Sequence, residues 1–251
     1  MKKIALIIVF GLLASFAFFA CVKNEDETLK IDNGYEYFPL SVGKYKIFQV
    51  DSIVYDTLAG GKSVKVDSVR FFQKEVVVDT FVNQIGETVF RVERYERKTS
   101  TQPWVIKDVL SYGRNSVQAT RSEQGLRLLK MPFPLKKRQN WSSTIYIDVL
   151  VQVKIGGQYV EMFKNWASNT TNLNTPETIN GKRYGKVMTI KHADDENKLE
   201  LRKVTEKYVR DTGLVFNEML ILDTQSTSNG ETWRKKAQRG FIYRQYLVEN
   251  N

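Results

Sequence analysis

The amino-acid sequence predicts an all-β protein, and three observations support this fold class. From Lys44 onward, polar residues alternate with β-branched or aromatic residues, which is the period of a half-buried strand. No segment after the first twenty residues has the apolar spacing of an amphipathic helix. Dipeptides that suit tight hairpin turns separate the alternating runs: Gly60-Gly61, Gly156-Gly157, Asn180-Gly181 and Asn229-Gly230. We therefore expect about ten to twelve antiparallel strands in curved sheets that form a sandwich or a partly closed barrel.

The predicted strands follow one another with short connections. They span residues 44–55, 64–82, 88–95, 104–112, 143–155, 158–163, 183–191, 199–209, 214–222 and 241–248. The hairpin over residues 149–160 has the clearest pattern. Residues 196–210 are helical in composition, yet Val204 and Val209 favour a strand and the apolar residues do not share one helical face. Because strands do not alternate with helices, we do not expect a parallel sheet with a nucleotide-binding crevice.

Two Phe-Pro-Leu segments precede aromatic-rich strands, at Phe38-Pro39-Leu40 and at Phe133-Pro134-Leu135. Proline fixes φ and removes a backbone donor, so each segment marks a strand entrance or a sheet edge. We expect the apolar residues of these elbows to plug the end of the core.

The first twenty residues have the pattern of a secretory signal helix. Lys2 and Lys3 precede an uncharged stretch, Ile4–Ala20, which ends directly before the single cysteine, Cys21. This arrangement resembles the lipobox of bacterial lipoproteins, although Phe18-Phe19 replaces the usual leucine and small residue. The resemblance implies that Cys21 is lipidated, with palmitate among its acyl chains, and becomes the mature N-terminus. An uncleaved N-terminal anchor is the alternative.

Residues 21–34 are polar and acidic, and we expect them to form a flexible tether before a single β domain over 35–251. The tether resembles a signal that routes some lipoproteins to the outer face of the outer membrane. This implies an outer-membrane protein at the cell surface. A plain spacer, with the domain at the periplasmic face, is the alternative.

Short motifs resemble those of an uncharacterised group of β-rich bacterial lipoproteins. In that group a PLxxGxxW segment precedes the middle strands and a GLV turn precedes a late one. Here Leu135 is followed by Trp141, with Arg138 at the glycine position, and Gly213-Leu214-Val215 supplies the late turn. The first elbow has Gly43 but Lys46 at the tryptophan position. The resemblance implies an extended curved antiparallel sheet and carries no known activity.

The reactive residues argue against most catalytic and metal-binding classes. One cysteine and one histidine exclude a disulfide framework and a Cys-cluster site. We expect His192 to lie in an exposed charged turn, and the adjacent Asp194–Asn197 lacks the spacing of a calcium loop, so we expect no metal and no cofactor. Nothing selects a catalytic pair among the carboxylates on predicted strands, so we expect no enzyme: Glu93, Glu96, Asp148 and Glu161.

The net charge of +10 is scattered along the chain and matches no nucleic-acid-binding motif. We therefore expect no nucleic-acid partner. The charge favours either simple solubility or attraction to anionic lipid headgroups and acidic glycans.

The aromatic residues are the candidate ligand contacts. Indole rings can stack on sugars or contact acyl chains, although most aromatic residues in a β protein fill its core. We expect Trp166 and the Asn/Thr-rich residues 167–174 to form an exposed binding rim. The candidates are Trp104, Trp141, Trp166 and Trp233.

These observations predict a lipid-anchored protein whose β domain binds a glycan, lipid or protein partner without catalysis. The alternatives are a periplasmic lipid carrier or chaperone of envelope assembly and, third, a carboxylate-dependent hydrolase. An internal cavity lined by aromatic residues would favour the carrier. A flat, exposed aromatic strip would favour glycan binding, and two carboxylates within about 10 Å across a cleft would favour the hydrolase.

Overall fold

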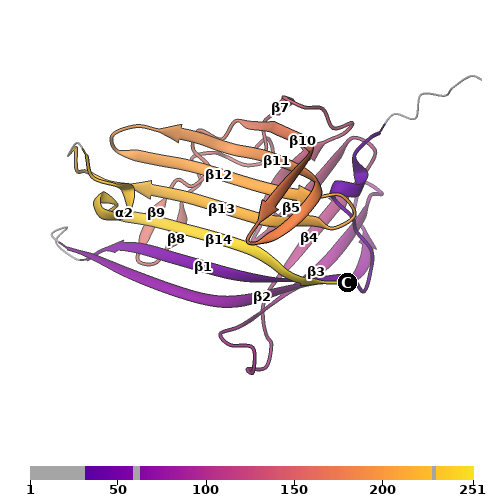
Figure 1. Cartoon of the computed structure of the whole chain (residues 1–251), viewed down its shortest axis with the longest axis horizontal. Helices are drawn as coiled ribbons and strands as arrows, with labels where there is room; N and C mark the ends of the chain where they lie inside the picture. The colour runs from indigo at the N-terminus through magenta and orange to yellow at the C-terminus, as the bar shows by residue number, and fades with distance from the viewer. Residues whose placement is uncertain (1–31, 59–62, 228–229) are drawn as a thin grey trace, which may run out of the picture. The chain divides into compact units, whose positions relative to one another are not determined.

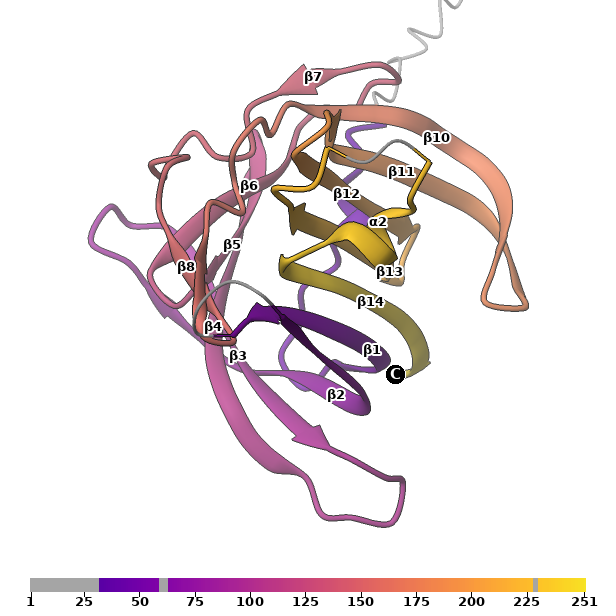
Figure 2. The same cartoon turned by 90° about the vertical axis from the view of Figure 1, so that its left-hand side faces the viewer.

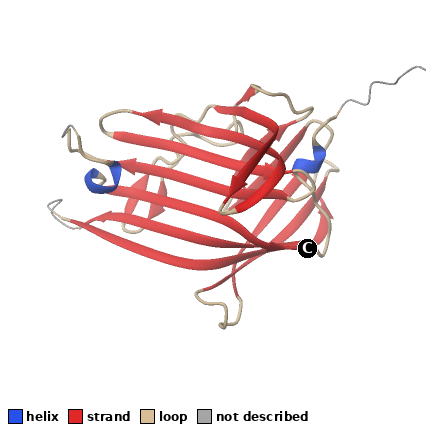
Figure 3. Cartoon of the chain, viewed as in Figure 1, coloured by secondary structure: helices blue, strands red, loops and turns tan. Residues whose placement is uncertain are grey.

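The computed structural model describes residues 32–251 except 59–62 and 228–229. The predicted signal segment, Cys21 and most of the predicted tether therefore lie outside the described residues. Twelve strands form one antiparallel sheet in the order β6-β5-β4-β3-β2-β1-β14-β13-β12-β11-β10-β7, and β8 pairs with β9 in a second small sheet. The described helices are a 3₁₀ turn, η2 (Tyr35–Tyr37), and the four-residue α2 (Trp233–Lys236). The all-β prediction is confirmed (Figure 3).

The strands have the following bounds. They are β1 (Tyr45–Thr57), β2 (Val64–Val82), β3 (Thr88–Arg97), β4 (Val105–Arg114), β5 (Gln118–Glu123), β6 (Leu126–Pro132), β7 (Asn140–Trp141), β8 (Val153–Ile155), β9 (Gln158–Val160), β10 (Ser168–Ile179), β11 (Lys182–Glu196), β12 (Glu200–Val209), β13 (Gly213–Asp223) and β14 (Arg239–Asn250).

The main sheet curls until its two edges meet, as Figures 1 and 2 show from two sides. At the seam, the backbone N–H of Leu129 on β6 donates to the carbonyl of Ser143, just after β7, at 2.9 Å. The indole N–H of Trp141 donates to the carbonyl of Leu129 at 3.2 Å. A partly closed barrel, one of the two predicted forms, is therefore the architecture.

Most of the predicted strands exist, but one predicted strand is largely irregular and four observed strands were not predicted. Residues 196–210 contain strand β12, as predicted, and the hairpin around Gly156-Gly157 exists as β8 and β9. Most of the predicted strand 143–155 is instead irregular, because β8 begins only at Val153. Strands β5, β6, β7 and β10 were missed. In β10 the polar Asn/Thr sequence has the composition of a loop.

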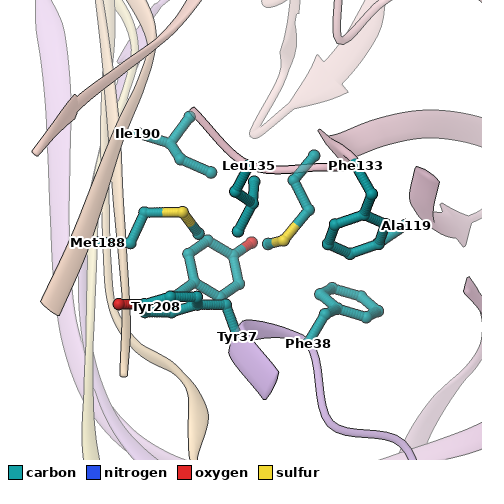
Figure 4. Close-up of a cluster of buried hydrophobic side chains, with 9 residues drawn as sticks. Tyr37, Phe38, Ala119, Phe133, Leu135, Met188, Ile190 and Tyr208 are labelled. Carbon is teal, nitrogen blue, oxygen red and sulfur yellow. The ribbon is translucent and has the colours of Figure 1, made fainter. Parts of the chain in front are cut away.

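The two Phe-Pro-Leu elbows meet in one buried cluster at one end of the sheet (Figure 4). Phe38 from the first elbow packs with Phe133 and Leu135 from the second. Met188 on β11 and Tyr208 on β12 complete the contact with the opposite wall of the sheet. The prediction that the elbows plug the end of the core is confirmed.

Residues 32–34, at the end of the predicted tether, are bonded to the β domain. The carboxylate of Asp32 accepts two hydrogen bonds of 2.8 Å from the guanidinium of Arg210. The carbonyl of Asn33 accepts the backbone N–H of Leu135 at 3.1 Å. These bonds fix the start of the described chain against the plugged end.

The connection between β7 and β10 carries the β8–β9 hairpin and is held to the end of β1. The backbone N–H of Gly157 donates to the carboxylate of Asp56 at 3.0 Å, and the Gln158 amide donates to the carbonyl of Thr57 at 3.0 Å. Within the described part of the chain, no helix has the length and apolar character to cross a membrane.

Candidate functional site

The curled sheet lines a partly open cavity of about 350 Å³, at the lower end of the roughly 300–1,000 Å³ typical of small-molecule sites. Alternate residues of each wall strand line the cavity, because every second side chain of a strand points to the same face. On β6, for example, the lining residues are Leu126, Leu128 and Lys130. The β7–β10 connection adds lining residues from Val153 to Trp166.

One part of the cavity wall is apolar and rich in aromatic or flexible side chains. Met and aromatic side chains adapt to alkyl chains and ring systems. The members of this wall are Phe71, Leu126, Leu128, Val153, Met162, Phe163, Trp166, Val204, Met219, Phe241 and Tyr243.

A cluster of paired charges forms part of the polar wall. Arg94 donates to Glu75 at 3.0 Å and also pairs with Glu123. Arg121 donates to Glu123 at 2.8 Å, and the Tyr112 hydroxyl donates to Glu75 at 2.6 Å. Burial opposes ionisation of Glu123, yet the two guanidinium groups hold its pKa at about 2. The cluster therefore stays ionised and is balanced within itself.

A second polar cluster is centred on Glu206. Its carboxylate lies 2.6 Å from the Lys130 ammonium and 2.9 Å from His192 Nε2. The Tyr208 hydroxyl donates to it at 2.6 Å. On the other side of the imidazole, His192 Nδ1 lies 2.9 Å from the Ser168 hydroxyl.

The electrostatics of this second cluster follow from its burial. Burial lowers the pKa of His192 despite the neighbouring Glu206 carboxylate, so the imidazole is neutral at neutral pH. Burial opposes ionisation of Glu206 as well, but Lys130 and His192 bring its pKa well below the ordinary value. The result is a buried Lys130–Glu206 ion pair beside a neutral histidine.

Hydrogen bonds link Ser168 to His192 and His192 to Glu206, which is the connectivity of a hydrolase triad. The serine side chain, however, does not line the cavity. Ser168 is 1% exposed and His192 is 0% exposed, and neither side chain lines the cavity. The indole of Trp166 stacks on the imidazole with ring centroids 5.6 Å apart. A nucleophile must reach its substrate, and Ser168 is not placed to contact a molecule in the cavity.

The predicted exposed turn at His192 is wrong. His192 lies inside β11 at a bulge, where the register with β12 shifts between Lys191 and Ala193. Bulges redirect side chains, and here the imidazole is buried against Trp166. The alternation Met188, Ile190, His192 was the signal that could have indicated an inward-facing residue.

The exposed rim predicted around Trp166 is also wrong. Trp166 is only 9% exposed and its indole N–H donates to the carbonyl of Met162 at 2.8 Å. Residues 168–174 belong to strand β10 rather than to a loop.

The four candidate tryptophans do not gather on one surface. Trp166 lines the cavity, and Trp141 lies at the seam, edge-on to His192 with centroids 6.3 Å apart. Trp104, before β4, packs against the guanidinium of Arg97. Trp233 on α2 donates to Glu196 at 2.8 Å.

The carboxylates singled out in the sequence are dispersed. Glu96 lines the cavity, whereas Glu93 accepts bonds from Arg91 and Tyr95. Asp148 accepts the backbone N–H of Leu150 within its own turn. Over the described ranges, no group of three or more His, Cys, Asp or Glu side chains is arranged to hold a metal ion.

The cavity also has neutral hydrogen-bonding groups that sequence reasoning missed. The Gln245 amide donates to the Gln73 amide oxygen at 2.9 Å. Asn217, which pairs with Gln245 in the sheet register, is 9% exposed and lines the cavity. Its side-chain oxygen is buried without a hydrogen-bond partner. A bound molecule with a hydroxyl or N–H group would satisfy this oxygen.

Comparison with known proteins gives little for assigning a function. No protein-family profile matches the chain. No curated protein matches it either. Among solved structures, a crystal structure described as a "putative lipoprotein" from Parabacteroides distasonis ATCC 8503 is similar to it, with 10% identity and a TM-score of 0.33 over 86% of this chain and 98% of that one. At this TM-score the likeness carries no inference about function.

Proposed function

We propose that this protein binds an amphipathic small molecule, such as a single-chain lipid, in the cavity of its curled sheet, without catalysis. The observation that carries the proposal is a partly open cavity of about 350 Å³ that is lined by aromatic-rich apolar side chains and by polar side chains of the same strands. Among the sequence-based hypotheses, an internal cavity of this kind favours the carrier.

The distribution of charge supports an amphipathic ligand over a purely polar one. Arg94 and Arg121 are paired with Glu75 and Glu123, and Lys130 is paired with Glu206. Their charges are already satisfied, so they offer little to a ligand that carries many charges. The apolar wall would instead stabilise an alkyl or ring system by about 25 cal/mol per Å² of buried apolar area.

The ionisation of two cavity carboxylates, Glu123 and Glu206, supports a non-catalytic role. A glycosidase of the two-carboxylate type needs one carboxyl group that is protonated near neutral pH. Glu123 and Glu206 both have lowered pKa values and stay ionised. Neither is suited to act as a general acid.

The test is direct binding of amphiphiles to full-length protein that carries Cys21→Ala, so that no attached acyl chain competes. A dansyl-labelled fatty acid should increase in fluorescence on binding, and unlabelled dodecanol should displace it. Retention of the probe at the same affinity after the cavity is filled by a larger side chain would refute this role.

We also propose that Cys21 carries the lipid anchor and that the protein belongs to the outer membrane, with the cell surface as the favoured face. Radiolabelled palmitate should label the wild type and not Cys21→Ala, which should leave the membrane fraction. Protease added to intact cells should digest the β domain if it faces outward. Protection until lysis would assign it to the periplasmic face, where a lipid carrier of envelope assembly would act.

A further inference from the structure

The sheet divides at one point and leaves a groove. Strand β2 pairs with β3 from Phe72 onward, opposite Arg97, whereas residues 64–71 of β2 pair with β1 alone. The β3–β4 hairpin extends away from this part of β2 (Figures 1 and 2). A groove of about 550 Å³ lies here, and its lining includes Val69 of β2 and Val105 of β4.

The groove adjoins the internal cavity. Phe71 and Glu96 line both the groove and the cavity. Val69 and Val105 are 46% and 63% exposed, so the groove has apolar walls open to solvent. A molecule lying in the groove would therefore be at the mouth of the cavity.

Arg97 borders this groove, and within the described residues its guanidinium has no carboxylate partner. Its guanidinium carbon lies 4.2 Å from the centre of the Trp104 ring and 5.7 Å from that of Phe72, so two aromatic faces orient it. Phe72 is on the face of β2 opposite to Phe71, so the guanidinium lies at the outer rim of the groove. Its Nε is buried and has no hydrogen-bond partner. Lys98 lines the same groove, and in the described part of the chain neither cation takes part in an ion pair.

We propose that Arg97 and Lys98 bind the anionic head group, a carboxylate or a phosphate, of the amphiphile whose apolar chain occupies the cavity. This inference rests on the proposed function and names the charge of its ligand. An oriented guanidinium without a partner is suited to a planar or tetrahedral oxyanion, since it donates several hydrogen bonds in a fixed fork. Glu96 borders the same groove, and its carboxylate would oppose an anion there.

The experiment compares ligands that differ in the head group alone. Full-length Cys21→Ala protein with the dansyl fatty acid as probe is titrated with dodecanoate, dodecyl phosphate and dodecanol. We expect each anionic ligand to bind about tenfold more tightly than dodecanol, the scale of a charge-assisted hydrogen bond. Arg97→Gln should abolish this preference and leave dodecanol affinity unchanged, while Arg97→Lys should restore part of it.

Lys107→Gln is the matched control, because Lys107 is an exposed lysine on β4 that does not line the groove and its loss changes the net charge equally. It should keep the preference for anions. Glu96→Gln should strengthen the binding of dodecanoate, since it removes the opposing charge.

The outcomes separate the two proposals. Equal affinity of wild type for dodecanol and dodecanoate would overturn the head-group site while leaving the binding function in place. Binding of no amphiphile would overturn both proposals. Displacement of the probe by inorganic phosphate alone would assign the groove to free anions and would also contradict a head group attached to a bound chain.

Discussion

The imidazole of His192 lies nearly parallel to the indole of Trp166, with the ring centroids 5.6 Å apart and an interplanar angle of 22°. Trp166 also lines the cavity, whereas His192 does not. The indole therefore separates the proposed ligand site from the imidazole of His192, whereas Lys130 and Glu206 line the cavity directly. Its position links the stability of the sheet seam to the shape of the cavity.

Loss of the Trp166 ring should destabilise the protein. Trp166→Ala is expected to lower the free energy of unfolding by about 3–5 kcal/mol, because it removes a buried ring and opens the histidine cluster. Trp166→Phe should cost much less, since it keeps a ring against His192. Urea denaturation followed by circular dichroism measures both variants. Equal losses for the two would show that stacking on His192 contributes nothing.

The buried His192 should make stability fall in mild acid. The folded-state pKa of His192 lies below its ordinary value, so below pH about 6.5 the unfolded chain takes up a proton that the folded protein refuses. One such group lowers the unfolding free energy by up to about 1.4 kcal/mol per pH unit in this window. Urea denaturation at several pH values from about 7.5 to about 5.5 measures this slope. His192→Gln should flatten it, and an unchanged slope would assign the acid sensitivity to other groups.

The carboxylates of Glu206 and Glu123 affect the free energy of unfolding at a lower pH than His192 does. The pKa of Glu206 is well below its ordinary value and that of Glu123 is about 2. Their stabilisation is present above the unfolded-state pKa of roughly 4.3 and is lost as pH falls through the folded-state values. The unfolding free energy of the His192→Gln variant should therefore still fall when the pH is lowered below roughly 4.3.

The buried Lys130–Glu206 pair should be costly to break. Both side chains are 6% exposed, and Lys130→Met would leave the Glu206 carboxylate without its cation. We expect a loss of about 3–5 kcal/mol in thermal or urea unfolding. The matched control is Lys65→Met, since Lys65 pairs with Asp67 at 58% and 61% exposure, and no measurable change is expected there. A Lys130→Met protein as stable as Lys65→Met would contradict the assignment of an ionised pair.

Gly240 should be irreplaceable in β14. It has a φ of +106°, and a Cβ added there would lie 2.0 Å from the carbonyl oxygen of Ile221 on β13. Gly240→Ala should therefore destabilise the protein by more than about 1 kcal/mol. Gly185→Ala, where a Cβ would meet no atom within 4 Å, is the control and should be nearly neutral. Comparison of the two melting temperatures checks this prediction.

The sequence predicted the strands well because their signal is local. Alternation of apolar and polar residues is visible within one segment, and it identified β12 despite the helical composition of residues 196–210. The plug was also predictable, because proline and its apolar neighbours mark strand ends at Pro39 and Pro134. In β10, tertiary pairing with β11 overrode the loop-like composition.

The candidate site was predicted less well, since its parts meet only through the curl of the sheet. Arg94 on β3 and Glu75 on β2 are paired neighbours in the sheet. Lys130 on β6 and Glu206 on β12, by contrast, are 76 residues apart in the sequence. A charged residue on a strand has the same local pattern whether it faces solvent or a polar cavity. The burial of His192 at a bulge likewise depends on contacts that are distant in sequence. The same is true of Arg97, whose Nε has no hydrogen-bond partner.

Amphiphile binding to a variant with a filled cavity tests whether the ligand site lies inside the sheet. Leu128 lines the cavity on β6, so Leu128→Trp in the full-length Cys21→Ala protein would occupy part of its volume. Leu199→Trp places the same side chain at a position that is 45% exposed and away from the cavity. We expect the dansyl fatty acid to bind the Leu199→Trp protein as it binds the parent, and to bind the Leu128→Trp protein at least about tenfold more weakly. Equal affinity for the two folded variants would contradict a ligand site inside the sheet.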